Sequence, residues 1–210
     1  MNPASFLTDR TQCILYYASE GPTAETCTSW IGGNAPAYFD DKANFIHEGD
    51  QFFYFYMSIA HPFKPAWMIS VFIPQSYEEY LEHNIYPDCS IKVIEHPVSA
   101  ESTQDIFKHP GLIRHKITDG EVRNDLESVK EPFLIKFGGT PRLIQKEGFY
   151  SKRLAEDLLS FLFQVDEDGY PDTLLRDHYS YPFGYGALYI YAGIQAGEVK
   201  APVAGFWQFS

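Results

Sequence analysis

Cysteine is scarce in this sequence, and its spacing argues against a disulfide framework. The 210 residues contain three cysteines, Cys13, Cys27 and Cys89, an odd number with no paired spacing. Small disulfide-stabilised secreted domains carry an even number of cysteines. The N-terminus also lacks a basic segment followed by an apolar stretch, and no apolar run reaches the roughly 18 residues that span a bilayer. The sequence therefore predicts a cytoplasmic protein that does not enter a membrane.

Basic residues are the second shortage. The chain has 16 Lys and Arg against 28 Asp and Glu, which gives a net charge of −12, and residues 1–105 hold only four of the bases but 14 of the acids. Nucleic acids and anionic membranes are bound through basic contacts, so neither is an expected partner. An acidic surface would instead speed the encounter with a basic protein. The alternative is that the negative charge serves only solubility.

Catalytic and metal-binding motifs are missing as well. None of the seven histidines forms a His-Glu-x-x-His pair or joins the cysteines at zinc-finger spacing. No serine lies in a Gly-x-Ser-x-Gly elbow, and the glycine pairs lack the other residues of a dinucleotide or phosphate loop. The acidic run 166–168 has Tyr170 and Pro171 where a calcium loop needs a ligand and a glycine, which favours a solvated turn over weak calcium binding. We expect neither an enzyme nor a cofactor or metal site.

Aromatic residues, by contrast, are abundant and help to build an internal repeat. They form 17% of the chain, with 17 Phe and 15 Tyr. Two segments share three features in the same order: a Gly-Gly pair with a nearby proline, an aromatic-rich run, and a run of β-branched and aromatic residues. These features lie at 30–36, 53–57 and 67–73, and again at 136–141, 161–165 and 187–191. The offset is 106 residues at the glycines and 108 at the aromatic run. Such runs bounded by Gly and Pro predict strands.

The repeat predicts an α+β fold that is mainly antiparallel sheet, made of two diverged copies of one sheet unit with a few short helices. We expect one compact domain, with the first copy at about 1–100, a connection at about 101–131 and the second copy at about 132–210. Ser76 and Glu79 form a capping-box pattern that predicts a short helix over 76–82. Leucines at helical spacing over 154–162 favour a helix, but the repeat favours a strand from Leu159 onward.

Three segments of the second copy resemble a known family. They are Leu-Ile-Lys-Phe-Gly-Gly-Thr-Pro at 134–141, Phe-Leu-Phe-Gln-Val-Asp at 161–166 and Gly-Ala-Leu-Tyr-Ile-Tyr at 186–191. This pattern resembles the YwqG-like family of bacterial proteins of unknown function. The first copy fits loosely, because it has an extra residue before Pro36 and has Ser58 near the place where a glutamine is expected. The resemblance implies an α+β fold with much antiparallel sheet, and it implies no established activity or cofactor. Members often occur beside bacterial toxins, which suggests an immunity role for some of them.

Binding is therefore the expected mode of action. The first hypothesis is an immunity protein, a monomer or weak dimer, that neutralises a basic bacterial toxin through an acidic surface. Tyrosines in the loop-like stretch 179–185 could add contacts, because Tyr is enriched at interfaces and in sugar sites. The alternatives are a small-ligand or carbohydrate-binding module that uses the groove between the copies, and an unrecognised hydrolase. The candidate partner-binding residues are Asp40, Asp41, Glu48, Asp50, Glu78, Glu79, Glu82, Tyr181 and Tyr185.

Overall fold

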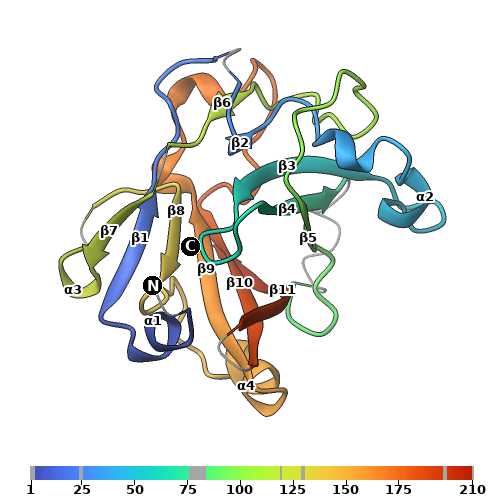
Figure 1. The fold of residues 1–210 in the computed structure, drawn as a ribbon. Helices are drawn as coiled ribbons and strands as arrows, with labels where there is room; N and C mark the ends of the chain where they lie inside the picture. Colours follow the sequence, from blue (N-terminus) through green and yellow to red (C-terminus); the bar gives the residue numbers. More distant parts are fainter. Residues whose placement is uncertain are drawn as a thin grey trace.

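Two antiparallel sheets form the protein in a computed structural model that describes residues 3–23, 26–75, 84–118, 120–128, 131–195 and 198–209 (Figure 1). The larger sheet has the spatial order β11-β10-β9-β8-β1-β7, and the smaller sheet has the order β5-β4-β3-β2-β6. The strands paired within each sheet run antiparallel to one another. The predicted α+β class with mainly antiparallel sheet is confirmed.

The elements are short and are separated by irregular segments. The larger sheet contains β1 (Gln12–Tyr16), β7 (Glu121–Asn124), β8 (Ile135–Gly138), β9 (Leu159–Asp166), β10 (Gly186–Gln195) and β11 (Glu198–Phe209). The smaller sheet contains β2 (Trp30–Ile31), β3 (Phe53–Ala60), β4 (Trp67–Pro74), β5 (Lys92–Pro97) and β6 (His115–Lys116). The helices are α1 (Pro3–Asp9), α2 (Ala43–Ile46), α3 (Asp125–Ser128) and α4 (Phe149–Glu156), with 3-10 turns η1 (Ala37–Phe39), η3 (Glu167–Gly169) and η4 (Asp172–Leu174). None of these helices is long and apolar enough to cross a membrane.

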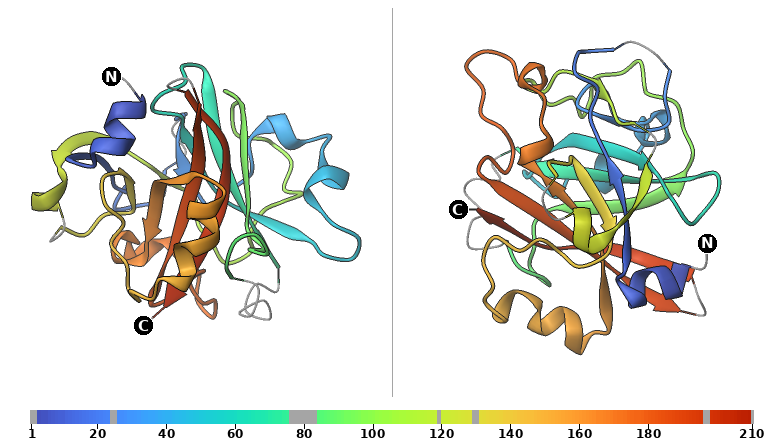
Figure 2. Two further views of the ribbon diagram at one scale, coloured as in Figure 1. Left: turned by 90° about the horizontal axis from the view of Figure 1, so that it is seen from below. Right: turned by 90° about the vertical axis from the view of Figure 1, so that its left-hand side faces the viewer.

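Helix predictions had mixed outcomes. The strand expected from Leu159 onward is confirmed, because β9 begins at that residue. The helix suggested by the leucine spacing is shorter than the pattern, because α4 covers Phe149–Glu156 and ends before Leu158. Helix α4 lies against β9 and β11, at the lower end of the larger sheet (Figure 2). The short helix expected over 76–82 lies outside the described residues.

Strand β3 is buried on both of its faces. The main core joins the two sheets and includes Tyr56 and Met57 of β3, whereas Phe53 and Phe55 belong to a second cluster on the opposite face. A β-bulge between Phe55 and Met57 interrupts the simple alternation of side chains. The aromatic run of β3 therefore serves packing, and most of it is not available as a contact surface.

Strand pairing fixes the offset of the repeat at 106 residues. In the first copy Trp30 pairs with Ser58, and in the second copy Lys136 pairs with Gln164. Strands β3 and β9 start at Phe53 and Leu159, which differ by the same 106 positions. The offset of 108 expected at the aromatic runs was wrong, because it aligned aromatic residues by composition and only the strand register shows which residues correspond. Ser58 occupies the position that Gln164 has in the second copy.

The Gly-Gly turns of the two copies make matching hydrogen bonds. The indole Nε1 of Trp30 donates to the carbonyl oxygen of Asn34 at 2.9 Å, and the Nζ of Lys136 donates to the carbonyl oxygen of Thr140 at 2.7 Å. In each turn, the residue whose carbonyl accepts this bond also donates its backbone N–H to an acidic side chain. Asn34 donates to Glu101 at 2.9 Å, and Thr140 donates to Asp125 at 3.1 Å. The two turns are therefore the same structural unit, although their side chains differ.

The glycines of these turns predict a specific stability effect. Gly33 and Gly139 have φ values of +74° and +65°, and an added Cβ would collide with Glu101 and Asp125 respectively. Alanine at Gly139 should lower the free energy of unfolding by about 3 kcal/mol, because it combines left-handed strain with displacement of a buried carboxylate. Gly49 is the matched control, since its φ is +58° but nothing lies within 4 Å of an added Cβ.

Chemical unfolding of G139A, G33A and G49A would measure these differences. We expect G49A to cost only about 1 kcal/mol, the strain of a left-handed alanine. Equal losses in G139A and G49A would contradict the contact assigned to Asp125.

Strand pairing also links the two copies and the connection between them. Strand β1 lies near the start of the first copy but pairs with β8 of the second copy, and β6 lies in the stretch 101–131 between the copies but pairs with β2 of the first. Strand β7 then extends the larger sheet by pairing with β1. The stretch 101–131, expected to be a connection, thus supplies a strand to each sheet. These pairings tie the copies together through backbone hydrogen bonds.

The loop between the second and third strands is much longer in the second copy than in the first. Residues 61–66 join β3 to β4, a connection of six residues, whereas residues 167–185 join β9 to β10, a connection of 19 residues. The second copy therefore carries 13 additional residues at this point. In Figure 2 this long loop stands out from the larger sheet and reaches toward the β2–β6 end of the smaller one.

Candidate functional site

The long loop 167–185 is held firmly against the rest of the protein. The hydroxyl of Tyr170 donates to the carbonyl oxygen of Pro182 at 2.9 Å and is also hydrogen-bonded to the hydroxyl of Tyr56 in β3. Further along, Leu175 forms an isolated β-bridge with Leu112. The ring of Tyr181 stacks on that of Tyr170, with centroids 5.0 Å apart. The loop is therefore an ordered platform that bridges the two sheets.

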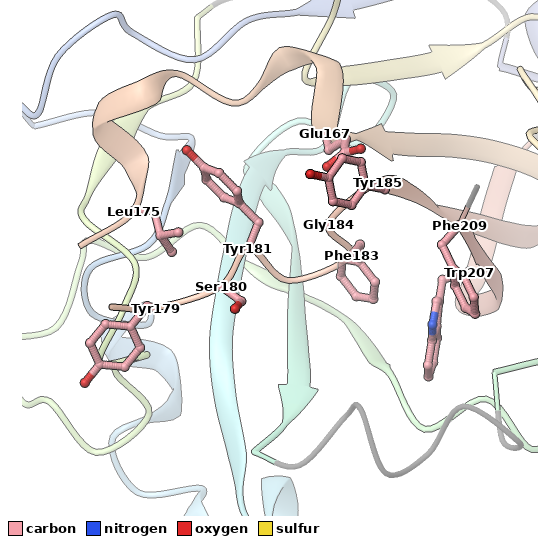
Figure 3. A pocket seen from close by; sticks show the side chains of 10 residues that line it. All are labelled: Glu167, Leu175, Tyr179, Ser180, Tyr181, Phe183, Gly184, Tyr185, Trp207 and Phe209. Carbon is pink, nitrogen blue, oxygen red and sulfur yellow. The ribbon is translucent and has the colours of Figure 1, made fainter. Parts of the chain in front are cut away.

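A cavity of about 650 Å³ opens between this loop and strand β11. Its interior is formed by Phe183 and Trp207, which are only 5% and 1% exposed and have ring centroids 5.8 Å apart. Its rim is formed by Tyr179, Tyr185 and Phe209, which are 45%, 78% and 41% exposed. Figure 3 shows Phe183 near Trp207 and Phe209, with Tyr185 beside Glu167. The complete lining is Glu167, Leu175, Tyr179, Ser180, Tyr181, Phe183, Gly184, Tyr185, Trp207 and Phe209.

The backbone around this cavity is strained. Phe183 and Tyr185 have φ values of +59° and +58°, and His178 in the same loop has a φ of +71°. Residues with large side chains rarely occupy the left-handed region, and each instance costs on the order of 1–3 kcal/mol. Three such residues lie within this one anchored loop, and the surrounding contacts hold them in this conformation.

Glu167 places a carboxylate at the edge of the cavity. Its side chain is half-buried and accepts hydrogen bonds from the backbone N–H groups of Tyr185 and Gly186. Burial raises the pKa of this carboxyl above its ordinary value, and the neighbouring Asp168 and Asp166 raise it further. No cationic side chain among the described residues forms an ion pair with Glu167. Its carboxylate is thus held by two backbone N–H groups, without a cationic partner among the described residues, at the mouth of an aromatic cavity.

A second, smaller hollow of about 230 Å³ adjoins the first and shares Glu167 and Tyr185 with it. Asp166 and Asp168 line this hollow, and Arg142 contacts their carboxylates at 2.7 Å and 2.8 Å. The main-chain N–H of Asp168 also donates to Asp166 at 3.1 Å. The acidic run 166–168 is therefore a turn held by an arginine. Across the described ranges, no three His, Cys, Asp or Glu side chains gather in a way that could hold a metal ion.

The predicted site residues fall in separate places. Tyr181 and Tyr185 both line the aromatic cavity. The acidic candidates at 40, 41, 48 and 50 flank α2 in the sequence, and α2 lies at the far right of Figure 1, whereas the long loop lies beside β2 and β6. Glu78, Glu79 and Glu82 lie outside the described residues. The structure therefore does not join the described acidic candidates to the tyrosines in one surface.

Most of the described acidic candidates already have internal partners. Asp41 contacts the Nζ of Lys42 at 2.6 Å, and this contact lowers the pKa of the carboxyl. Glu48 contacts the Nζ of Lys92 at 2.6 Å, and Asp40 accepts from the Oγ of Ser102 at 2.5 Å. Asp50 is exposed, and no ion pair involving it occurs in the described part of the chain. These contacts reduce the charge that the α2 region can offer to a partner.

The sequence analysis missed Leu175, Trp207, Phe209 and the role of Glu167 in the cavity. Trp207 and Phe209 belong to β11, and Glu167 was considered only as part of a calcium-like run. The aromatic spacing of 207 and 209 was a usable signal, because residues two apart in a strand share a face. Nothing local indicates that this face meets the loop 167–185.

Comparison with known proteins adds no assignment: no family model matches the chain, and no curated protein matches it.

Proposed function

We propose that this chain is a non-catalytic binding protein that engages a basic partner protein, with the aromatic cavity receiving a cationic side chain of that partner. The observation that carries this proposal is the carboxylate of Glu167, which forms no ion pair within the described residues, beside the exposed ring of Tyr185. Carboxylates and aromatic faces both attract guanidinium and ammonium groups, most strongly when those groups leave water.

The overall charge supports the same kind of partner. A net charge of −12 would steer a basic protein toward the chain, and the buried Trp207 with its aromatic rim offers the enclosed anchor site that interface hot spots require. With the resemblance to YwqG-like proteins, the partner class we propose is a bacterial toxin, and the role is that of an immunity protein. The steering charge would come from the whole acidic surface, including Asp50, and the specific contact from the cavity.

Substitution at the cavity tests this function. The immobilised protein would be exposed to lysate of its source organism at low and high salt, and any basic protein recovered would be purified and titrated against variants. Tyr185→Ala and Glu167→Gln should each weaken binding roughly tenfold, the effect of losing a desolvated cation–π or charge-assisted contact. Matched controls are Phe149→Ala, a 57% exposed ring on α4, and Glu198→Gln at an exposed acid.

Two results would contradict the proposal. One is recovery of no protein from a lysate that is shown to contain the product of a toxin gene located beside the gene for this chain. The other is an affinity that stays at the wild-type value in both cavity variants while salt still weakens binding, because binding would then use another acidic surface.

A small ligand is the second candidate, since a cavity of about 650 Å³ lies within the usual size of small-molecule sites. Under that alternative, neutral oligosaccharides should raise the melting temperature of the protein in a saturable way. The shift should disappear in Tyr185→Ala and persist in Phe149→Ala.

A further inference from the structure

A separate cavity of about 490 Å³ lies beside the Gly-Gly turn of the first copy. Its wall contains Gly33 and Asn34 of the turn and the carboxylate of Glu101, and it also contains three cationic side chains from distant parts of the sequence. Those cations are Lys108, Arg114 and Arg176. The chain has only 16 Lys and Arg in 210 residues, so three of them around one hollow are a local concentration of positive charge in an acidic protein.

Arg114 is fixed in place by the protein itself. Its Nε donates to Glu101 at 2.5 Å, and its Nη2 donates to the sulfur of Cys27 at 3.1 Å. Its Nη1 donates to the carbonyl oxygen of Thr23. The stem of Arg114 packs against Gly33, where an added Cβ would lie 2.9 Å from its Cβ. This residue supplies a rigid wall whose charge is largely balanced by Glu101.

Lys108 and Arg176 are in a different situation. Both are exposed, and neither forms an ion pair in the part of the chain that the structure describes. The backbone N–H of Arg176 donates to the carbonyl oxygen of Gly111 at 2.9 Å, which fixes the main chain from which its side chain extends. Both side chains therefore remain available to donate charge-assisted hydrogen bonds to an anion in this hollow.

We propose that this cavity binds the phosphate or carboxylate group of a small anionic molecule. Arg176 and Lys108 donate charge-assisted hydrogen bonds to its oxygens, and Arg114 with the Gly33 turn forms the fixed wall behind it. Arginine suits such a site because its planar guanidinium matches two oxygens of one group. The cavity has room for an organic portion beyond the anionic group, since its volume of about 490 Å³ is that of a small-molecule site. This site is separate from the aromatic cavity and does not depend on the partner proposed for that cavity.

Calorimetric titration with inorganic phosphate, pyrophosphate and citrate, at matched ionic strength and pH, tests the site. At least one probe should bind saturably and raise the melting temperature. A preference for pyrophosphate over citrate would assign phosphate chemistry, and the reverse would assign carboxylate chemistry. Arg176→Gln and Lys108→Gln should each weaken binding by at least fivefold. Arg153→Gln, at an exposed arginine on α4, is the matched control and should bind as the wild type does.

Three outcomes would overturn the proposal. They are no saturable heat with any probe, a melting shift that sodium chloride of equal ionic strength reproduces, and equal affinities in the wild type and Arg176→Gln. Because Lys108 and Arg176 are exposed, their variants should fold, and chemical unfolding would verify this. None of these outcomes alters the expectation for Tyr185→Ala at the aromatic cavity.

Discussion

Replacing Asp125 by alanine should lower the free energy of unfolding by about 3–5 kcal/mol, one of the largest effects expected from a single substitution in this protein. The Nζ of Lys136 lies 2.6 Å from the Oδ1 of Asp125, and the two side chains are only 1% and 4% exposed. Asp125 also accepts from the backbone N–H of Thr140 at 3.1 Å. Alanine would leave a buried ammonium without its counter-charge and a buried N–H without its acceptor.

Two further variants separate the ion pair from general damage. Asp125→Asn combined with Lys136→Met removes both charges and keeps an acceptor for Thr140, so it should be more stable than Asp125→Ala alone. Glu121→Ala breaks the Arg123–Glu121 pair, whose side chains are 47% and 59% exposed, and should cost less than about 1 kcal/mol. Urea unfolding of the set measures each value. A cost for Asp125→Ala as small as that for Glu121→Ala would mean that the pair is solvated.

Acidification should destabilise the protein through buried histidines, of which His96, His109 and His61 have the pKa lowered to about 4 by burial. His96 and His109 are 0% and 8% exposed, and burial lowers the pKa of each from 6.5 to about 4. The Nδ1 of His109 accepts from the backbone N–H of Gly111 at 3.1 Å. The Nδ1 of His96 lies 2.8 Å from the carbonyl oxygen of Pro97, so its Nε2 can accept from the hydroxyl of Ser70. Both rings are therefore neutral and hydrogen-bonded in the folded protein.

The sign of the effect follows from proton binding. Between pH 6.5 and about 4 the unfolded chain binds a proton at each histidine and the folded protein does not, so stability falls as the pH falls. Each histidine should contribute about 2 kcal/mol of loss between pH 7.5 and 4.5. The measurement is the free energy of urea unfolding across this range.

Histidine variants isolate this contribution from that of the carboxylates. His109→Gln should flatten the dependence of stability on pH, whatever its effect at neutral pH, because Gln does not titrate. His178→Gln, at an exposed histidine, should leave the slope unchanged. An unchanged slope in His109→Gln would show that the ring is accessible to protons in the folded protein.

Local sequence patterns were enough to predict the fold class and the positions of several elements. The apolar run at 67–73 became β4, the run at 187–191 lies within β10, and the Gly-Gly pairs became equivalent left-handed turns. These features are local: a β-branched run favours a strand wherever it lies, and a Gly-Gly pair tolerates positive φ that other residues resist. Local signals of this kind also predicted that Tyr181 and Tyr185 lie in one loop.

Which distant residues come into contact depends on the packing of the two sheets and was not predictable from local patterns. The pairing of β1 with β8, the correspondence of Ser58 with Gln164, and the meeting of loop 167–185 with Trp207 all join residues far apart in the chain. The gathering of the cations 108, 114 and 176 around one cavity is of the same kind. Strand register and side-chain burial depend on the partner strand and the facing sheet, so no local pattern encodes them. The acidic candidates show the same limit, because the sequence counts charges but does not reveal that Asp41 and Glu48 already have lysine partners.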